Sequence, residues 1–236
     1  MNYVDISPSA VLGEQCKIGN FVTIGENCIL GEGVVLHNNV TLYPGVEIGD
    51  HTEIFDGAVI GRPPKSAGNT VHKLAKTFKP TVLGKNCVVG SNAVLYAQSV
   101  FGNNILIGDG AVVREGAVIE DFALIAMNCT FNHNVTLKSR SKVMDLSHIT
   151  ADTVIDEDVF VGVNVVSAND NGMRLKGQEV GAVNHIHIKT GSRIGSAVML
   201  LPGVTIGEQS LVGACSMVRR DVADGKTVMG IPAKEK

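Results

Sequence analysis

The sequence has no tryptophan, and aromatic residues make up only 4% of its 236 residues, although the hydrophobic fraction reaches 44%. The core must therefore be narrow and filled by small aliphatic side chains. No apolar run approaches the length that spans a membrane. The first residues, MNYVDISPSA, also lack the charged-then-apolar pattern of a signal peptide. We expect a single domain without a membrane partner.

A strong charge of either sign and a disulfide framework are missing as well. Twenty Lys and Arg against 23 Asp and Glu give a net charge of −3, which argues against binding to nucleic acid. A thiol at a small inward-facing position packs as a small hydrophobe. Four of the five cysteines occupy such a position in the repeat described next: Cys16, Cys28, Cys87 and Cys129. This usage indicates a reducing, cytoplasmic setting.

What the sequence has instead is a repeat of six residues. An aliphatic residue recurs at every sixth position, with a small or β-branched residue two positions before it and often a glycine after it. Neither an amphipathic helix nor an alternating strand has this period, whereas a β-helix does. The repeated position is held in three runs by Ile6, Leu12, Ile18, Ile24, Leu30, Leu36, Leu42, Ile48, Ile54 and Ile60, then by Leu83, Val89, Leu95, Phe101, Ile107, Val113, Ile119, Ile125, Phe131, Leu137, Val143, Ile149, Ile155, Val161 and Ser167, and finally by Ile188, Ile194, Leu200, Ile206, Val212 and Val218.

These 31 hexapeptides, taken three to a coil, predict a prism of about ten triangular coils. Two breaks in the period, at residues 62–80 and roughly 169–185, predict external loops. Insertions in a solenoid emerge on its outside and often carry the binding function. We therefore predict a β-helix domain over residues 1–222, interrupted by loops 62–80 and 169–185, and a C-terminal tail over residues 223–236.

The pattern [LIV]-G-x-x-[small]-x resembles that of the hexapeptide-repeat acyltransferases, which implies an all-β fold, the left-handed parallel β-helix. The run SAVMLLPGVTIGEQSLVGACSMVRRDV and the later GIPAK are similar to the ending of CoA-dependent sugar, serine and xenobiotic acetyltransferases. In those families this ending borders a CoA groove between subunits of a trimer. The resemblance implies acetyl-CoA as cosubstrate, a homotrimer with active sites between subunits, and Arg219, Arg220 and Lys234 as contacts of the CoA phosphates. Alternatively, these three are ordinary solvated charges.

His133 lies in the segment FNHNV, two residues after the inward Phe131, and should point outward at a turn. Residues eighteen apart stack in a three-sided coil, so Glu115 should lie about one strand spacing from His133, where its carboxylate can orient an imidazole base. The segment also resembles [VI]-E-H-D-C-x-[IL] of bacterial aminosugar N-acetyltransferases, whose histidine is the proposed base. Here Asn132 and Asn134 replace the flanking acids. We expect catalysis by His133, the alternative being a turn histidine bonded to backbone.

The other histidines are weaker candidates. His148, on an outward position, is the second candidate for the base. His185 and His187 share a strand face and could in principle hold a metal, but a third ligand is missing and structural hydrogen bonding is favoured. The trimeric γ-class carbonic anhydrases share the fold, yet their zinc trio includes an H-x-x-x-x-H pair that this sequence lacks. We expect no metal.

Both interruptions carry candidate substrate contacts. Residues 62–80 contain five basic and no acidic residues, which would attract a diphosphate. The prolines of GRPPK can hold Arg62 and Lys65 in place, although a solvated flap is the alternative. The stretch NDNGMR resembles the T-N-D-x-x-P-R segment of acetyltransferases that modify nucleotide-linked dideoxy sugars. Asn169, Asp170 and Arg174 stand at matching places there, with Met173 in place of proline.

Together these patterns predict an acetyl-CoA-dependent N-acetyltransferase acting on the amine of a nucleotide-linked amino sugar, with Asn132 and Asn134 among its substrate contacts. Transfer to a small hydroxyl acceptor is one alternative, although the missing flanking acids argue against it because hydroxyl acceptors depend more on a His–acid pair. A non-catalytic solenoid that serves as a binding module is the other.

Overall fold

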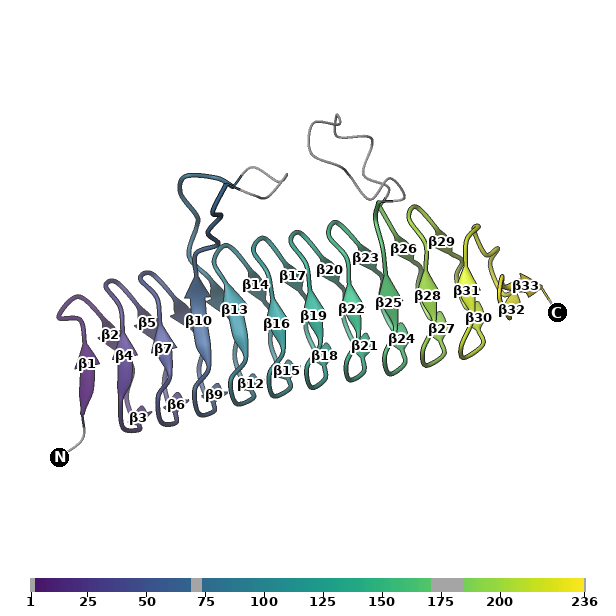
Figure 1. Cartoon of the computed structure of the whole chain (residues 1–236). Helices are drawn as coiled ribbons and strands as arrows, with labels where there is room; N and C mark the ends of the chain where they lie inside the picture. The colour runs from purple at the N-terminus through teal and green to yellow at the C-terminus, as the bar shows by residue number, and fades with distance from the viewer. Residues whose placement is uncertain (1–2, 69–73, 171–184, 236) are drawn as a thin grey trace.

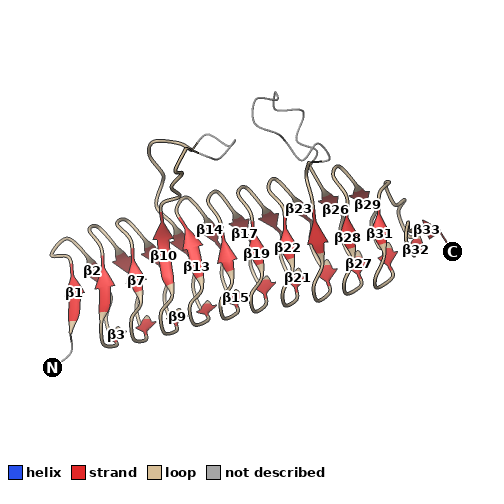
Figure 2. Ribbon diagram, viewed as in Figure 1, coloured by secondary structure: helices blue, strands red, loops and turns tan. Residues whose placement is uncertain are grey.

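The computed structural model describes residues 3–68, 74–170 and 185–235. Within these ranges the chain forms strands, turns and bends, and no helix that could cross a membrane occurs (Figure 2). Three long sheets enclose a prism of triangular cross-section (Figure 1). The all-β solenoid predicted from the period is confirmed.

The first sheet has 11 strands, in the order β1-β4-β7-β10-β13-β16-β19-β22-β25-β28-β31. Their bounds in that order are Val4–Ile6, Val22–Ile24, Thr41–Leu42, Val59–Arg62, Val94–Tyr96, Val112–Val113, Thr130–Phe131, His148–Ile149, Val166–Ser167, Met199–Leu200 and Met217–Val218.

The second sheet has ten strands, in the order β2-β5-β8-β11-β14-β17-β20-β23-β26-β29. Their bounds are Val11–Leu12, Ile29–Leu30, Glu47–Ile48, Val82–Leu83, Val100–Phe101, Val118–Ile119, Thr136–Leu137, Val154–Ile155, His187–Ile188 and Thr205–Ile206.

The third sheet has 12 strands, in the order β3-β6-β9-β12-β15-β18-β21-β24-β27-β30-β32-β33. Their bounds are Lys17–Ile18, Val35–Leu36, Glu53–Ile54, Val88–Val89, Leu106–Ile107, Leu124–Ile125, Lys142–Val143, Phe160–Val161, Arg193–Ile194, Leu211–Val212, Thr227–Met229 and Lys234–Glu235. The last two belong to the segment 223–236, so this segment continues the third sheet.

Consecutive coils pair as parallel strands with a register of eighteen residues. Val113 faces Phe131, for example, and Thr130 faces His148. In Figure 1 the first-sheet strands run upward on the near side while the coils advance from left to right, which is a left-handed winding. Since every coil repeats the same path, an outward residue has its neighbours above and below set by its position in the repeat.

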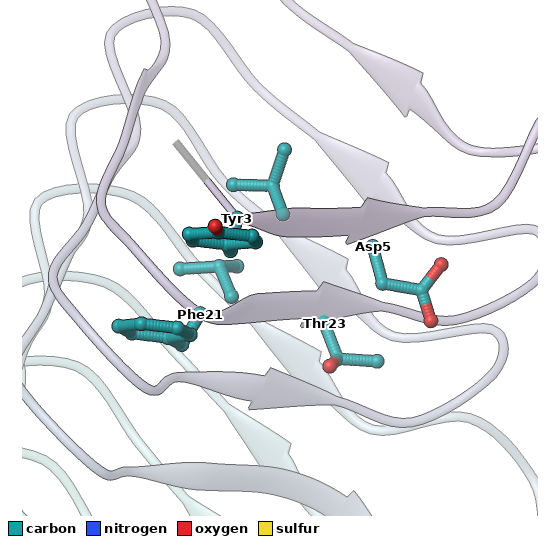
Figure 3. Close-up of a pocket in the computed structure, with 6 residues that line it drawn as sticks. Tyr3, Asp5, Phe21 and Thr23 are labelled. Atoms are coloured by element: carbon teal, nitrogen blue, oxygen red, sulfur yellow. The ribbon is translucent and has the colours of Figure 1, made fainter. Parts of the chain in front are cut away.

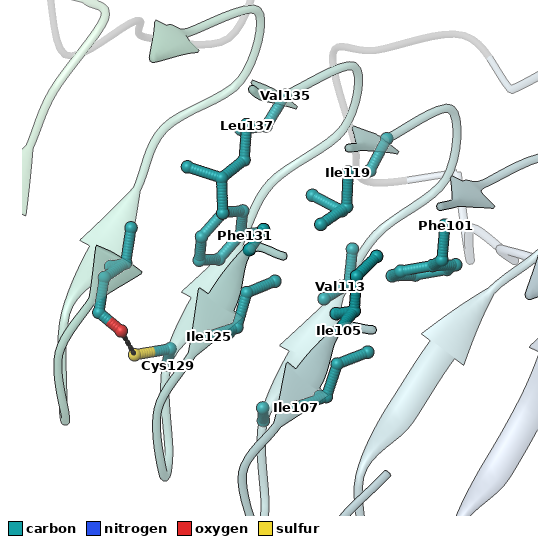
Figure 4. Close-up of a cluster of buried hydrophobic side chains, with 14 of the residues drawn as sticks. Phe101, Ile105, Ile107, Val113, Ile119, Ile125, Cys129, Phe131, Val135 and Leu137 are labelled. Carbon is teal, nitrogen blue, oxygen red and sulfur yellow. Dashed lines mark hydrogen bonds between the residues drawn. The ribbon is translucent and has the colours of Figure 1, made fainter. Parts of the chain in front are cut away.

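The core consists of the repeated inward residues. Each of the 31 aliphatic positions predicted from the period lies in one of β1 to β31, and from Ile24 onward the apolar ones are almost fully buried. Figure 4 shows Phe101 and Phe131 filling the centre among Ile and Val side chains. Such close packing of many small contacts is what holds a narrow core together.

The small inward position has a second function. Cys28 and Cys129 each donate from Sγ to a carbonyl oxygen of the next coil, at 3.2 and 3.1 Å. Ser99 and Ser147 make the same kind of bond, at 3.0 Å. Burial raises the pKa of the Cys129 thiol, which keeps it protonated and able to donate.

The two ends of the prism differ. At the N-terminal end the inward side chains of the first coil are only partly covered, and Tyr3 stacks on Phe21 with ring centroids 5.6 Å apart (Figure 3). At the C-terminal end β33 folds back antiparallel on β32, and Val228 beneath it is 7% exposed. One end is therefore capped, whereas the first coil is open.

Replacement of Phe131 by alanine should lower the free energy of unfolding by about 3–5 kcal/mol, because the ring is 1% exposed and its removal leaves a cavity. Phe122→Ala is the matched control, since that ring is 57% exposed and its loss should cost less than about 1 kcal/mol. Urea denaturation followed by circular dichroism measures both. Equal losses in the two variants would contradict the packing described here.

Candidate active site

Both interruptions and His133 lie on one edge of the prism. We call this the loop edge; it consists of the turns that join first-sheet strands to second-sheet strands. The first insertion leaves after β10, His133 follows β19, and the second insertion leaves after β25. Figure 1 shows the described part of the first insertion projecting from this edge. The features that break the sequence period are thus aligned in space.

Coil counting gives their separations along the axis. From β10 to β19 is three strand spacings and from β19 to β25 is two, which correspond to roughly 14 and 10 Å at about 4.8 Å per spacing. Arg219 and Arg220 follow β31, four spacings or roughly 19 Å beyond β19 on the same edge.

His133 is half-buried at its turn. Its backbone N–H donates to Asn132 Oδ1 at 2.8 Å, and the Asn134 side-chain amide lies 3.4 Å from its Nδ1. The same amide donates to Asp152 Oδ1 at 3.0 Å. Because Asp152 accepts from this nitrogen, the Asn134 amide presents a donor to His133, and Nδ1 is the ring nitrogen with the lone pair in this arrangement. Asn134 therefore contacts the imidazole, whereas Asn132 contacts the backbone of His133.

Glu115 occupies the coil before His133, and its carbonyl oxygen accepts from Asn134 N at 3.0 Å. Its carboxylate is bound by its neighbour: Arg114 donates to both Glu115 oxygens, at 2.8 and 3.1 Å, and to Asn132 Oδ1 at 3.2 Å. The side chain of Glu115 is 8% exposed, so this bidentate pair satisfies a buried charge. Arg114 thus links the Glu115 carboxylate to Asn132, whose Oδ1 accepts from the His133 backbone N–H.

His148 lies outside the loop edge, on the outward face of the first sheet. Its Nδ1 is 2.6 Å from the Thr130 hydroxyl, and Val166 is its neighbour in the next coil. Burial lowers the pKa of the imidazole below its usual 6.5, so His148 is a neutral group at neutral pH. A neutral imidazole can act as a base. The position of His148 on the sheet face, however, separates it from the two insertions.

Arg62 ends β10 on the loop edge, next to the half-buried Tyr96. Lys65 is exposed in the insertion that follows. Of the second insertion, Asn169 and Asp170 are half-buried where it leaves the prism, whereas Arg174 lies outside the described residues. The structure therefore brings Arg62, His133 and Asp170 to one edge.

The proposed CoA contacts divide into two groups. Arg219 and Arg220 are exposed and line a depression at the capped end, together with Lys226, Ala233 and Glu235. Lys234 is exposed on β33 and does not line it. The two arginines present adjacent cations on the loop edge.

The sequence analysis did not predict a cluster of His187, Asp156 and Lys138. His187 Nε2 lies 2.7 Å from Asp156 Oδ2, and Lys138 Nζ lies 2.8 Å from Asp156 Oδ1. Burial acts to raise the pKa of Asp156, but the hydrogen bonds from Lys138 and His187 outweigh it and lower the pKa. The structural hydrogen bonding favoured for His187 is confirmed. The spacing of 18 between Lys138 and Asp156 was the available signal.

No group of three His, Cys, Asp or Glu side chains suited to a metal ion occurs in residues 3–68, 74–170 and 185–235. Across those same ranges the loop edge carries amides, carboxylates, guanidinium groups and the imidazoles of His133 and His185.

Known proteins match parts of this chain. Residues 1–105 match the family of the GMPPB C-terminal domain. The bifunctional protein GlmU of Rubrobacter xylanophilus is 33% identical over 101 residues, which are 43% of this chain and 20% of that protein. The galactoside O-acetyltransferase of Escherichia coli is 33% identical over 92 residues, 35% of this chain and 45% of that enzyme. Over less than half of its length the chain is thus similar to proteins that include a named acetyltransferase.

The crystal structure of an Arabidopsis UDP-N-acetylglucosamine acyltransferase superposes with a TM-score of 0.59 at 19% identity, covering 99% of this chain and 72% of that one. At this identity the likeness concerns the fold, and it agrees with the left-handed β-helix expected from the hexapeptide-repeat pattern. The chain matches a fifth of the length of the first curated relative and less than half of the second.

The lowered pKa of His148 has a consequence for stability. Because the folded protein resists protonating this imidazole, the unfolded chain binds more protons once the pH falls below about 6.5, and stability is lost in that direction. Wild type should therefore lose more unfolding free energy than His148→Gln between pH 7.5 and 5. Urea midpoints at the two pH values measure this.

The exposed His51 supplies the matched control, because His51→Gln makes the same exchange at a position that is not buried. A His148→Gln protein with the same pH dependence as wild type would show that this imidazole is not held neutral by burial.

Proposed function

We propose that this chain is an acetyl-CoA-dependent N-acetyltransferase acting on the amine of a nucleotide-linked amino sugar. The observation that supports the proposal most is the shared edge: His133, the base of each insertion and the Arg219–Arg220 pair all face the same side of the prism. A two-substrate transfer needs such an edge, because donor and acceptor must reach one base from different directions.

The donor side is supported by the C-terminal coils. Arg219 and Arg220 are exposed cations at a depression, and guanidinium groups suit the phosphates of CoA. The relatives named as acetyltransferases support acetyl-CoA as the donor. Lys234 remains a candidate contact within reach of a ligand that extends over β33.

The acceptor side is supported by the polar groups around the base. Asn132 and Asn134 flank the imidazole, and Asp170 stands where the second insertion begins. A carboxylate can accept hydrogen bonds from a sugar hydroxyl or an ammonium, while an amide can bind either donor or acceptor groups. Arg62 and Lys65 supply the charge for the nucleotide's phosphates.

In the proposed reaction the amine lone pair attacks the thioester carbonyl carbon and forms the C–N bond. His133 accepts the amine proton at Nδ1, either directly or through one water. This proton replaces the 3.4 Å contact between Nδ1 and the Asn134 amide. The carbonyl oxygen becomes an oxyanion, for which a backbone N–H at a turn is the simplest donor. The C–S bond then breaks, and the imidazolium returns its proton to the CoA thiolate.

A homotrimer with sites between subunits suits the distribution of apolar side chains. Outside the loop edge, a group of large apolar residues is between 37% and 57% exposed on the first sheet and on the edge it shares with the third: Met127, Leu146, Val163, Val166 and Met199. Apolar surface of this kind marks a contact site, and a closed symmetric oligomer would cover it. The five free thiols, three of them buried, suit a reducing cytoplasm.

The O-acetyltransferase alternative has one specific observation in its favour. His187 and Asp156 form the histidine–acid pair that a poorly nucleophilic hydroxyl requires. The pair lies on the second sheet, away from the loop edge, which favours a structural use. A thiol-release assay with acetyl-CoA against nucleotide-linked amino sugars and small hydroxyl acceptors separates the two. Release with hydroxyl acceptors alone would exclude N-transfer, and absence of CoA binding would favour a non-catalytic module.

His133→Asn should lower kcat by about 10²- to 10⁴-fold, since it removes the proton acceptor. The oligomer should stay intact, because the imidazole contributes little to the core. His37→Asn is the matched control: it removes an imidazole that pairs with Glu53 at 2.7 Å, far from the loop edge, and should keep wild-type turnover. Near-normal acetylation by His133→Asn would transfer the role of base to His148, which His148→Asn tests directly.

A further inference from the structure

We propose that Tyr96 positions Arg62 to bind the diphosphate of the acceptor, and that the number of coils between Arg62 and His133 determines which amine of the sugar reaches the imidazole. We call Arg62 together with Tyr96 the acceptor station, and Arg219 with Arg220 the CoA station. This inference rests on the proposed function and adds to it a positioning residue and a constraint on the acceptor. The observation behind it is the β-bulge in β10, where the chain departs from its six-residue period.

A β-bulge re-aims Arg62. Ile60 pairs with Leu95, but Arg62 pairs with Tyr96, so Gly61 is the extra residue. Gly61 has φ of +83°, and a Cβ there would lie 2.5 Å from the Val46 side chain, so the position requires glycine. A bulge redirects the side chain that follows it. Arg62 is thereby turned onto the loop edge.

Tyr96 then holds the guanidinium in place. Arg62 Nη1 donates to the Tyr96 hydroxyl at 2.7 Å, and its Cζ lies 5.2 Å from the ring centroid. The backbone beneath is fixed too: the Tyr96 carbonyl accepts from the buried Thr81 hydroxyl at 2.9 Å, and Ala97 N donates to the Arg62 carbonyl at 3.0 Å. The tyrosine uses one of five guanidinium N–H donors.

An exposed arginine that is held against a ring loses little freedom when it binds an anion. Charge alone would make every basic residue of 62–80 an equal candidate. In the described part of that insertion, Arg62 is the basic residue with a side-chain hydrogen bond to the prism. This distinction selects Arg62 over Lys65, Lys76 and Lys79 as the fixed contact.

The axial distances fit two different ligands. The pantetheine arm of CoA joins its diphosphate to sulfur through about 13 bonds, or roughly 16 Å extended. That length is about 3 Å short of the roughly 19 Å between the coils of His133 and Arg219. A side chain can span the difference. On the opposite side, His133 and Arg62 are roughly 14 Å apart by coil count.

Tyr96, which holds the guanidinium, lies on β13, two strand spacings or roughly 10 Å from the coil of His133. An amine on the far side of a hexose ring lies roughly 6–8 Å from the phosphorus bonded to the anomeric oxygen, whereas an amine at C2 lies nearer. The acceptor station therefore suits a diphosphate linked directly to an amino sugar. A free amino sugar would reach His133 without an anchor.

Binding measurements on the intact protein test the two stations without requiring turnover. Isothermal titration with UDP, TDP and CoA should show that Arg62→Ala weakens a nucleoside diphosphate by at least tenfold and CoA by less than twofold. The double variant Arg219→Ala/Arg220→Ala should show the reverse. Arg140→Ala is the matched control, because Arg140 is an exposed arginine on a different edge, paired with Asp158 at 2.7 Å.

Conservative variants separate positioning from loss of fold. Tyr96→Phe keeps the ring and removes the hydroxyl, so UDP or TDP should bind about three- to tenfold more weakly, with the loss appearing in KM for the acceptor and not in KM for acetyl-CoA. Arg62→Lys should recover part of the affinity lost in Arg62→Ala. Circular dichroism confirms that each variant is folded.

The outcomes distinguish this inference from the function on which it rests. Acetyl transfer by wild type with an unchanged acceptor KM in Arg62→Ala would overturn the station and leave the function standing. Separate binding of CoA and a nucleoside diphosphate to the two stations, without transfer to any amino sugar, would support the station and overturn the function. Loss of CoA affinity in Arg62→Ala would overturn the assignment of the two ends.

Discussion

The structure depends on one constraint, the parallel pairing of each coil with the next at a register of eighteen residues. Inside each sheet the strands are bonded on both sides along the prism, so beyond a single bulged residue such as Gly61 the chain cannot insert residues within a strand without breaking the pairing of two neighbours. Longer insertions must leave at a turn. This is why both insertions emerge at turns, and why a residue on an outward position inherits its neighbours from the repeat.

The same constraint decided how much could be read from the sequence. The period alone located the 31 repeated inward positions that are mostly aliphatic, because a narrow three-sided core buries the same positions of every hexapeptide. It also placed Glu115 one coil before His133. It did not predict that Arg114 would take up the Glu115 carboxylate, because register defines neighbouring positions and leaves the choice among competing partners to side-chain conformation.

Two other contacts cannot be predicted from the eighteen-residue spacing. His187 and Asp156 lie on either side of the second insertion, so they are not eighteen residues apart and the repeat does not predict their pairing. The contact of Arg62 with Tyr96 depends on Gly61 being a bulge, and glycine follows the aliphatic residue at many places where φ is negative and no bulge forms. In both cases the period is interrupted, and only the three-dimensional path shows which residues meet.

A repeated fold has the difficulty that its coils are alike, whereas a reaction needs unlike groups in a defined order. Along the loop edge this order is produced by exceptions placed at different coils: a bulged arginine at one, an imidazole flanked by amides three coils on, and paired arginines four coils beyond that.

Since each coil adds the same rise, the number of regular coils between exceptions sets the distance between chemical groups. The regular repeats therefore contribute to specificity even though they present no reactive side chain. Inserting or deleting one whole coil between Arg62 and His133 would keep the same positions of every remaining hexapeptide inward, yet it would change the span between phosphate and amine by about 4.8 Å, which exceeds the difference between neighbouring positions on a sugar ring.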